Sequence, residues 1–168
     1  GEDGTIFDSC IIQNCTTNTA VVGSRHNQSF YSCQFLYNDK HYEKKIPGPG
    51  AFMIGDEGLF KLQDCLFMGN IGGFLGGALH FNISNALLID NISFIDNQVN
   101  LDFSSNDYSH YGGAIYISQE IDTNKFSIQN FTLRNCYFAG NSVRQYGGAI
   151  YLKFSQNDKI IHNYSMRI

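Results

Sequence analysis

Residues 62–70 read LQDCLFMGN, and variants of this nine-residue stretch recur along the chain. Each copy begins with an apolar residue, carries Cys or Ile three positions later and Phe two positions after that, and closes on Asn. A decayed copy starts at Phe7. The chain is therefore a repeat protein. The clearest further copies are residues 30–38 (FYSCQFLYN), 89–97 (IDNISFIDN) and 133–141 (LRNCYFAGN).

A second recurring segment begins with small residues. It reads GGALHF from Gly76, GGAIYI from Gly112 and GGAIYL from Gly147. A looser copy, GPGAFMI, starts at Gly48, and a degenerate one starts at Ala20. The two kinds of segment alternate along the chain, so together they form one repeat.

The length of the repeat varies, and this variation favours strands over helices. Cys33 and Cys65 are 32 residues apart, whereas Cys65 and Ile92 are 27 apart. The extra residues lie in polar stretches such as 98–110 and 118–125. Loops of a β-solenoid can lengthen outward without disturbing the stacked strands, whereas helical repeats keep a constant length.

We therefore expect an all-β fold, a right-handed parallel β-helix (solenoid) of about five rungs, formed by residues 1–168 as one segment. Alternation within the glycine-led segments places Ile and Leu inside and leaves His80, Tyr116 and Tyr151 outside. Each glycine pair is expected to supply the positive φ that a tight corner needs. These pairs are Gly76 and Gly77, Gly112 and Gly113, and Gly147 and Gly148.

The nine-residue segment predicts three columns of stacked side chains, because neighbouring strands lie about 4.8 Å apart. One column holds thiols, one holds phenyl rings, and one is an amide ladder that satisfies the turn backbone. The thiol column is Cys10, Cys33, Cys65 and Cys136. The phenyl column is Phe35, Phe67, Phe94 and Phe138. The amide column is Asn38, Asn70, Asn97 and Asn141, for which we expect a structural role.

The glycine-led segment paired with Phe-x-x-Asn resembles the repeats of the chlamydial polymorphic outer-membrane proteins. It is also similar to repeats in large secreted proteins of some protists. The resemblance covers roughly residues 20–168, where three GGAI-type segments alternate with four Phe-x-x-Asn segments. It implies a right-handed parallel β-helix at a cell surface, in adhesion or in a surface coat.

Composition limits the possible partners. The chain has 168 residues and a formal charge of −4, with 11 Lys and Arg scattered among 15 acids. This length is enough for one domain with a substantial core. The absence of a basic patch disfavours a nucleic-acid surface. No apolar run reaches membrane-spanning length and no export signal opens the chain at Gly1, so we expect no membrane span.

Six Asn-x-Ser/Thr sequons occur, more than this composition would give by chance. Asn27 and Asn130 each lie six residues before a ladder cysteine, and Asn163 has the matching place in the last repeat. Strand alternation puts these three and Asn82 on the solvent face. We expect N-glycosylation of several sequons and hence a eukaryotic secretory pathway, with unmodified surface asparagines as the alternative. The sequon residues are Asn14, Asn27, Asn82, Asn91, Asn130 and Asn163.

Ile92 replaces cysteine in the thiol column, which marks an apolar interior position rather than a metal site. No Cys-x-x-Cys or Cys/His spacing predicts zinc. Neighbouring rungs bring Cα atoms within reach of a disulfide, so Cys10–Cys33 and Cys33–Cys65 stay open, as does Cys10–Cys15. Buried free thiols are the preferred interpretation for most of the cysteines.

Some parallel β-helices are polysaccharide lyases or glycosidases, whose acidic residues gather in one groove. Here Asp64, Asp90 and Asp96 fall at three different repeat positions, and no histidine aligns with a Ser or acidic partner. We therefore expect no enzyme, and no catalytic, cofactor-binding or metal site. Tyr116 and Tyr151 form an aromatic column of the kind that can bind sugars, although cross-strand packing is the more common use.

The sequence predicts a non-enzymatic extracellular structural protein, an N-glycosylated β-helical fibre or surface-coat segment. The alternative is an adhesin segment that binds a host or glycan surface. Neither end of the repeat looks capped, so we expect end-to-end self-association or continuation in a longer chain. The expected partners are other copies of the chain, covalent N-glycans and surface glycans.

Overall fold

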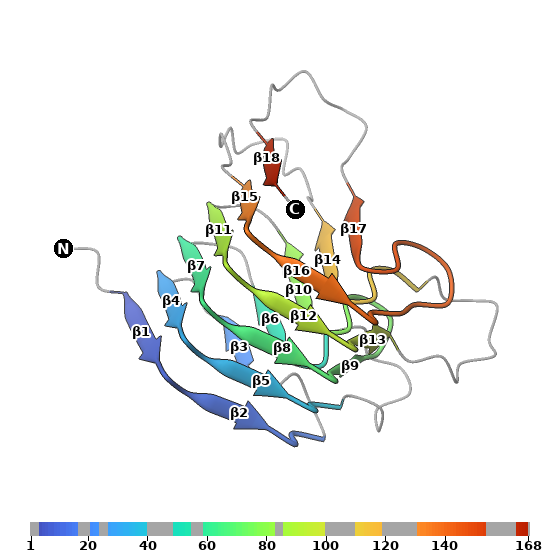
Figure 1. Ribbon diagram of the computed structural model, residues 1–168, viewed down its shortest axis with the longest axis horizontal. Coiled ribbons are helices and arrows are strands. Elements are labelled where there is room, and N and C mark those ends of the chain that lie inside the picture. Colours follow the sequence, from blue (N-terminus) through green and yellow to red (C-terminus); the bar gives the residue numbers. More distant parts are fainter. Residues whose placement is uncertain are drawn as a thin grey trace.

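The chain winds as a coil of short parallel strands (Figure 1). The computed structural model describes residues 4–16, 21–23, 27–39, 49–54, 59–82, 86–99, 110–118, 131–153 and 164–167. Across these described ranges every regular element is a strand, with no helix. This confirms the predicted all-β parallel solenoid.

Three sheets form the walls of the coil, and the chain visits them in turn. The first sheet contains β1 (Thr5–Asp8), β4 (Gln28–Tyr31), β7 (Phe60–Gln63), β11 (Leu87–Asp90), β15 (Phe131–Arg134) and β18 (Tyr164–Arg167). The second contains β2 (Ile11–Gln13), β5 (Gln34–Leu36), β8 (Leu66–Met68), β12 (Ser93–Ile95) and β16 (Tyr137–Ala139). The third contains β3 (Val21–Gly23), β6 (Phe52–Ile54), β10 (Leu79–Asn82), β14 (Ile115–Ser118) and β17 (Ile150–Lys153).

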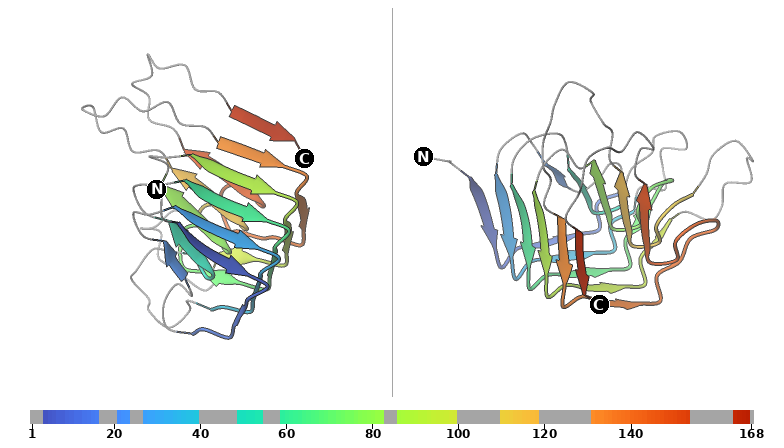
Figure 2. Two further views of the ribbon diagram at one scale, coloured as in Figure 1. Left: turned by 90° about the vertical axis from the view of Figure 1, so that its left-hand side faces the viewer. Right: turned by 90° about the horizontal axis from the view of Figure 1, so that it is seen from above.

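A short two-stranded sheet, β9 (Ile71–Gly72) with β13 (Gln98–Val99), lies between the second and third sheets in the chain path. All strand pairs in the described ranges are parallel and in register, as in β11, where Leu87 pairs with Phe60 on one side and Phe131 on the other. Figure 2 shows the stacked strands from two further sides. The stretches 98–110 and 118–125, predicted to absorb the varying repeat length, lie mostly outside the described residues.

The core fills the space between the sheets with alternate side chains of each strand. In β4, β7 and β11 the first and third residues are buried and the second and fourth are half-buried. Phenyl rings stack along the coil axis: Phe35 lies 4.5 Å from Phe67, Phe67 lies 5.2 Å from Phe94, and Phe94 lies 4.9 Å from Phe138. The rings therefore form one continuous aromatic column in the core, between the sheets.

Two corners of the coil each depend on a residue with positive φ just before an inward side chain. Left-handed backbone is uncommon outside Gly, and Asn and Asp tolerate it best. The thiol corner, between the first and second sheets, uses Ser9, Ser32, Asp64, Asn91 and Asn135, with φ between 52° and 56°. The amide corner, after the second sheet, uses Asn14, Tyr37, Gly69, Asp96 and Gly140, with φ between 52° and 63°.

A third corner, the glycine corner, precedes each strand of the glycine-led segments. Gly76, Gly112 and Gly147 have φ of 63°, 66° and 70°, but the second glycine of each pair does not have positive φ. The predicted reason for the pair is therefore wrong for its second member. A Cβ on Gly113 would collide with the Gly148 carbonyl oxygen and lie 2.7 Å from the Ser142 nitrogen, so close backbone packing requires glycine there.

Candidate functional site

The four predicted amide-ladder residues lie one above another and bond directly. Asn38 Nδ2 donates to Asn70 Oδ1 at 3.0 Å, Asn70 Nδ2 to Asn97 Oδ1 at 2.8 Å, and Asn97 Nδ2 to Asn141 Oδ1 at 3.0 Å. The first three are fully buried. Neighbours in this column are 32, 27 and 44 residues apart in sequence, so the ladder joins coils of different length.

Each ladder amide also bonds the backbone of the corner. The Asn70 side chain shows the pattern: its Nδ2 donates to the Phe35 carbonyl at 3.0 Å, and its Oδ1 accepts from the Asn38 backbone N–H at 3.2 Å. Cys15 occupies the first coil's place in this column, and its backbone N–H donates to Asn38 Oδ1 at 3.2 Å. The side chains therefore take over hydrogen bonds that the bent backbone does not make with itself.

The thiol column lies at the other corner. Cys33 Sγ donates to the Tyr31 carbonyl at 3.1 Å, Cys65 Sγ donates to the Gln63 carbonyl at 3.2 Å, and Cys136 repeats this contact two residues back. All five cysteines are free thiols in the structure. The sequence did not indicate these weak S–H bonds, which give cysteine a contact that Ile92 lacks at the same position.

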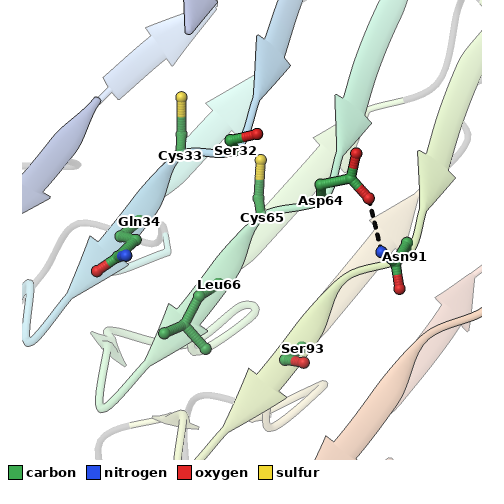
Figure 3. A pocket seen from close by; sticks show the side chains of 8 residues that line it. All are labelled: Ser32, Cys33, Gln34, Asp64, Cys65, Leu66, Asn91 and Ser93. Atoms are coloured by element: carbon green, nitrogen blue, oxygen red, sulfur yellow. Dashed lines mark hydrogen bonds between the residues drawn. The ribbon is translucent and has the colours of Figure 1, made fainter. Parts of the chain in front are cut away.

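An open pocket lies over the thiol corner and is lined by three successive coils (Figure 3). Burial raises the pKa of Cys65 to about 12 and also raises the pKa of Cys33. Both thiols are therefore protonated near neutral pH and are poor nucleophiles. The lining residues are Ser32, Cys33, Gln34, Asp64, Cys65, Leu66, Asn91 and Ser93.

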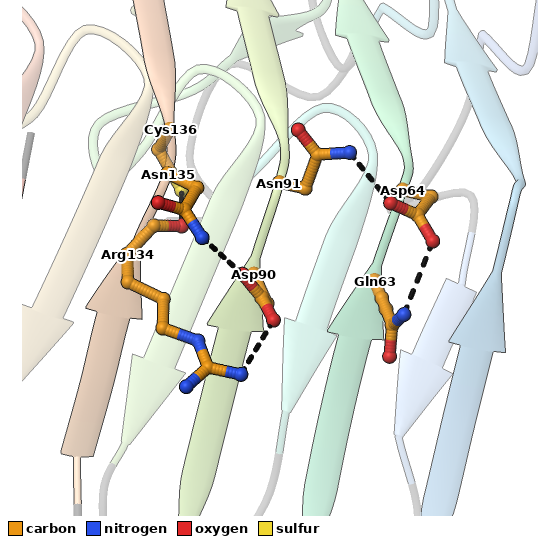
Figure 4. Close-up of polar contacts among 7 residues, drawn as sticks. All are labelled: Gln63, Asp64, Asp90, Asn91, Arg134, Asn135 and Cys136. Atoms are coloured by element: carbon orange, nitrogen blue, oxygen red, sulfur yellow. Dashed lines mark hydrogen bonds and ion pairs between the residues drawn. The ribbon is translucent and has the colours of Figure 1, made fainter.

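Each carboxylate at this corner bonds a polar side chain on an adjacent coil (Figure 4). Asp64 accepts from Asn91 Nδ2 of the next coil at 2.6 Å, and also from Nε2 of the preceding residue, Gln63, at 3.1 Å. Asp90 accepts from Arg134 Nη2 at 2.7 Å and from Asn135 Nδ2 at 3.0 Å. The hydrogen bond from Arg134 is the main cause that lowers the pKa of Asp90. These acids act as links between coils.

The described sequon residues differ in their surroundings. Asn14 and Asn91 are exposed at the amide and thiol corners, both with positive φ. Asn27, expected on the solvent face, is half-buried, and its Oδ1 accepts from the Leu59 backbone N–H at 2.6 Å. Asn82 is the last residue of β10, and its side chain is not among those that the structure describes. Asn130 and Asn163 lie outside the described residues.

A tyrosine cluster covers the outer side of the third sheet. Tyr116 lies outside the core cluster that contains Ile115 and Ile117, on the outer side where it was expected. It is nevertheless only 5% exposed, because the rings of His80, Tyr111 and Tyr151 pack around it at centroid distances of 5.0, 5.8 and 5.8 Å. Sequence reasoning noted these tyrosines but missed that the glycine corner folds Tyr111 back onto the strand that follows.

Groups of three or more side chains suited to holding a metal ion are absent from the part of the chain that the structure describes. Among those same residues, no helix has the length and hydrophobicity to cross a membrane. Searches of curated proteins and of solved structures returned no match.

The family model for the Chlamydia polymorphic membrane protein (Chlamydia_PMP) repeat matches residues 91–118 and 135–153. The matched residues make up less than a third of the chain. They include the amide-ladder residues Asn97 and Asn141 and the glycine pairs that begin at Gly112 and Gly147. Such repeats, as their name states, occur in membrane proteins of Chlamydia, which supports a structural or adhesive role at a surface. The two stretches identify repeats of the polymorphic membrane protein type in this chain, as the sequence resemblance predicted.

Proposed function

We propose that this chain is a non-enzymatic structural segment, an N-glycosylated solenoid wall of an extracellular fibre or surface coat. The observation that carries the proposal is the use of polar side chains at the corners. Asn70, Asp64 and Asp90 bond neighbouring coils. The sequon residues Asn14 and Asn91 lie exposed at the corners, and Asn91 also donates to Asp64 of the neighbouring coil.

The environment of the acids supports a structural role over glycoside cleavage. A glycosidase needs two carboxyl groups that face one groove. Asp64 and Asp90 instead accept hydrogen bonds from amide and guanidinium groups on the next coil, and Asp96 has positive φ at the amide corner. Carboxylates held in this way link coils, and we propose no reaction for them.

Adhesion is the second candidate, and the outer face of the second sheet favours it. Outward positions in β5, β8, β12 and β16 hold Gln, Leu, Met, Ser, Ile, Tyr and Ala, without a charged residue. Tyr137 and Ile11 there are 60% and 61% exposed. An uncharged face with exposed apolar side chains suits contact with another surface. End-to-end association of chains stays a prediction.

Secretion from a eukaryotic cell line tests the glycan part of the proposal. The purified chain is expected to lose mass after treatment with a peptide N-glycosidase, and Asn91→Gln is expected to remove one glycan. Asn135→Gln is the matched control, because Asn135 lies in the same corner column but is not a sequon. A secreted, folded chain without any glycan would contradict the proposal.

Two further measurements separate the fibre from the adhesin. Sedimentation velocity distinguishes self-associating rods from a monomer, and a glycan array tests adhesion.

A further inference from the structure

Two identical hexapeptides, YGGAIY at residues 111–116 and 146–151, bring four tyrosines together on adjacent coils. Tyr111 and Tyr146 form a parallel bridge, and Tyr116 pairs with Tyr151 between β14 and β17. The centroids of Tyr111 and Tyr151 lie 4.5 Å apart, the shortest separation between tyrosine rings in the described residues. The glycine corner therefore folds a tyrosine of one coil onto a tyrosine of the next.

The arrangement of the rings disfavours a sugar platform. Tyr116 and Tyr151 are stacked with an interplanar angle of 3°, and Tyr111 and Tyr146 with an angle of 18°. Sugars bind to exposed aromatic faces, whereas these faces cover one another. Tyr146 is nevertheless 53% exposed, and Tyr111 and Tyr151 are half-buried, so the cluster is accessible from solvent at one side.

We propose that this cluster is a site of oxidative cross-linking, at which a haem peroxidase with hydrogen peroxide couples Tyr111 to Tyr151 as dityrosine. The proposal goes beyond the proposed function and does not depend on glycosylation. Exposed Tyr146 is the residue through which the oxidant reaches the cluster, because its ring lies 5.4 Å from Tyr111 and 6.2 Å from Tyr151.

The chemistry balances with one peroxide for each bond. Each phenol loses one electron and its hydroxyl proton to give a tyrosyl radical. The two radicals form one carbon–carbon bond between positions ortho to the oxygens. Each ring then moves its ortho hydrogen to oxygen and regains its aromaticity and its hydroxyl group. The two electrons and two protons reduce hydrogen peroxide to two molecules of water.

The geometry selects the pair that couples. A biaryl bond joins two rings at their edges with a twist between their planes. Tyr111 and Tyr151 already have an interplanar angle of 36° at a centroid separation of 4.5 Å. The stacked pairs Tyr111–Tyr146 and Tyr116–Tyr151 have smaller interplanar angles, 18° and 3°, and larger centroid separations, 5.4 and 5.8 Å. A bond between Tyr111 and Tyr151 would join two coils of the wall covalently.

The test exposes the folded full chain to a haem peroxidase and hydrogen peroxide, followed by trypsin digestion and mass spectrometry. Trypsin leaves Tyr111 in the peptide 62–125 and Tyr151 in the peptide 145–153. The expected product joins these peptides, has two hydrogens less than their sum, and shows dityrosine fluorescence. Tyr111→Phe is expected to abolish the dityrosine at position 111, and Tyr151→Phe to lower the yield of the joined peptide several-fold. Tyr137→Phe, which removes an exposed tyrosine on β16, is the matched control and is expected to leave the yield unchanged.

Fragment spectra locate the bond within the joined peptides. Failure to form this product in the folded chain would overturn the proposal, as would coupling mainly through Tyr137 between separate chains. An equal yield in concentrated urea would also overturn it, because the coupling would then owe nothing to the fold. Each tyrosine variant retains the ring, and circular dichroism of the untreated proteins checks that they fold.

Discussion

The thiol corner and the amide corner share one backbone design and differ in the side chain that follows the residue with positive φ. At the thiol corner the inward residue is Cys33, Cys65 or, in one coil, Ile92. At the amide corner it is asparagine in four successive coils, Asn38, Asn70, Asn97 and Asn141. The same bend therefore accepts an apolar side chain at one place, whereas the other place repeats a specific amide.

Hydrogen bonding explains this difference. At the amide corner the backbone N–H of Asn38 donates to the side chain of Asn70, so the corner's backbone depends on the next coil's amide. At the thiol corner the shorter contact of Cys33 and of Cys65 is with a carbonyl two residues earlier in its own coil. Their contacts with the preceding coil, to the Phe7 and Phe30 carbonyls, are longer at 3.6 Å. An apolar residue in place of Asn38, Asn70 or Asn97 would leave buried backbone groups without these hydrogen bonds, whereas the thiol column accepts Ile92.

Replacing an amide is expected to have the largest effect. Asn70→Ala would leave the Asn38 N–H and the Phe35 carbonyl buried without their present partners. We expect a loss of roughly 3–5 kcal/mol in the free energy of unfolding, since each stranded buried group costs about 1–3 kcal/mol. Urea denaturation followed by circular dichroism measures it. Cys65→Ile is the matched variant and is expected to cost about 1.5 kcal/mol or less. Equal losses in the two variants would erase the distinction between the corners.

The glycine corner extends the comparison to a place where the absence of a side chain matters. Gly113→Ala would place a Cβ against the Gly148 carbonyl, and we expect a cost of roughly 1–3 kcal/mol from overpacking. At Gly148 the nearest atom to an added Cβ is the Asn141 oxygen at 4.0 Å. Gly148→Ala is therefore expected to change stability by about 0.5 kcal/mol or less. The same denaturation assay applies, and a Gly113→Ala protein as stable as the parent would refute the close packing.

Alkaline pH is expected to weaken the thiol corner but not the amide corner. Burial raises the pKa of Cys65 to about 12 in the fold, whereas an unfolded cysteine titrates at about 8.5. The unfolded chain therefore releases its proton first, so stability is complete below about pH 8.5 and falls as the pH rises towards 12. Cys65→Ile should reduce this slope. Unfolding curves recorded across that range measure it, and an unchanged slope in the variant would contradict the assignment.

Acid pH is expected to have the smallest effect, through His110. This residue is 1% exposed, and burial, together with the charge of Arg144, lowers its pKa. An unfolded histidine titrates at about 6.5, so the unfolded chain binds the proton first. The contribution of neutral His110 is therefore present above about pH 6.5 and is lost as the pH falls below it. In His110→Phe the new ring can pack against Phe74, whose centroid lies 5.5 Å from that of His110. This variant should make the free energy of unfolding less dependent on pH between neutral and mildly acid conditions.

Much of this architecture follows from spacing in the sequence. The repeated Cys-x-Phe-x-x-Asn spacing places three columns because parallel strands in register repeat every position on the next coil. The columns of positive φ at Asp64 and Asn91 could not be predicted, since the sequence shows only polar residues there. The burial of Tyr116 also escaped prediction, because it depends on how the glycine corner folds Tyr111 back. The inward and outward alternation of side chains along one strand gives no information on contacts that the preceding loop makes with that strand.

Solution NMR of the asparagine side chains tests the amide ladder most directly. The Nδ2 groups of Asn70 and Asn97 are buried and each donates two hydrogen bonds. Asn91 and Asn135 are exposed at the thiol corner, and each donates one hydrogen bond, to a carboxylate. After transfer into D2O, the ladder signals are expected to persist long after the signals of Asn91 and Asn135 have exchanged. Exchange of Asn70 and Asn97 as fast as that of Asn91 would contradict the ladder and, with it, the account of how this wall is held together.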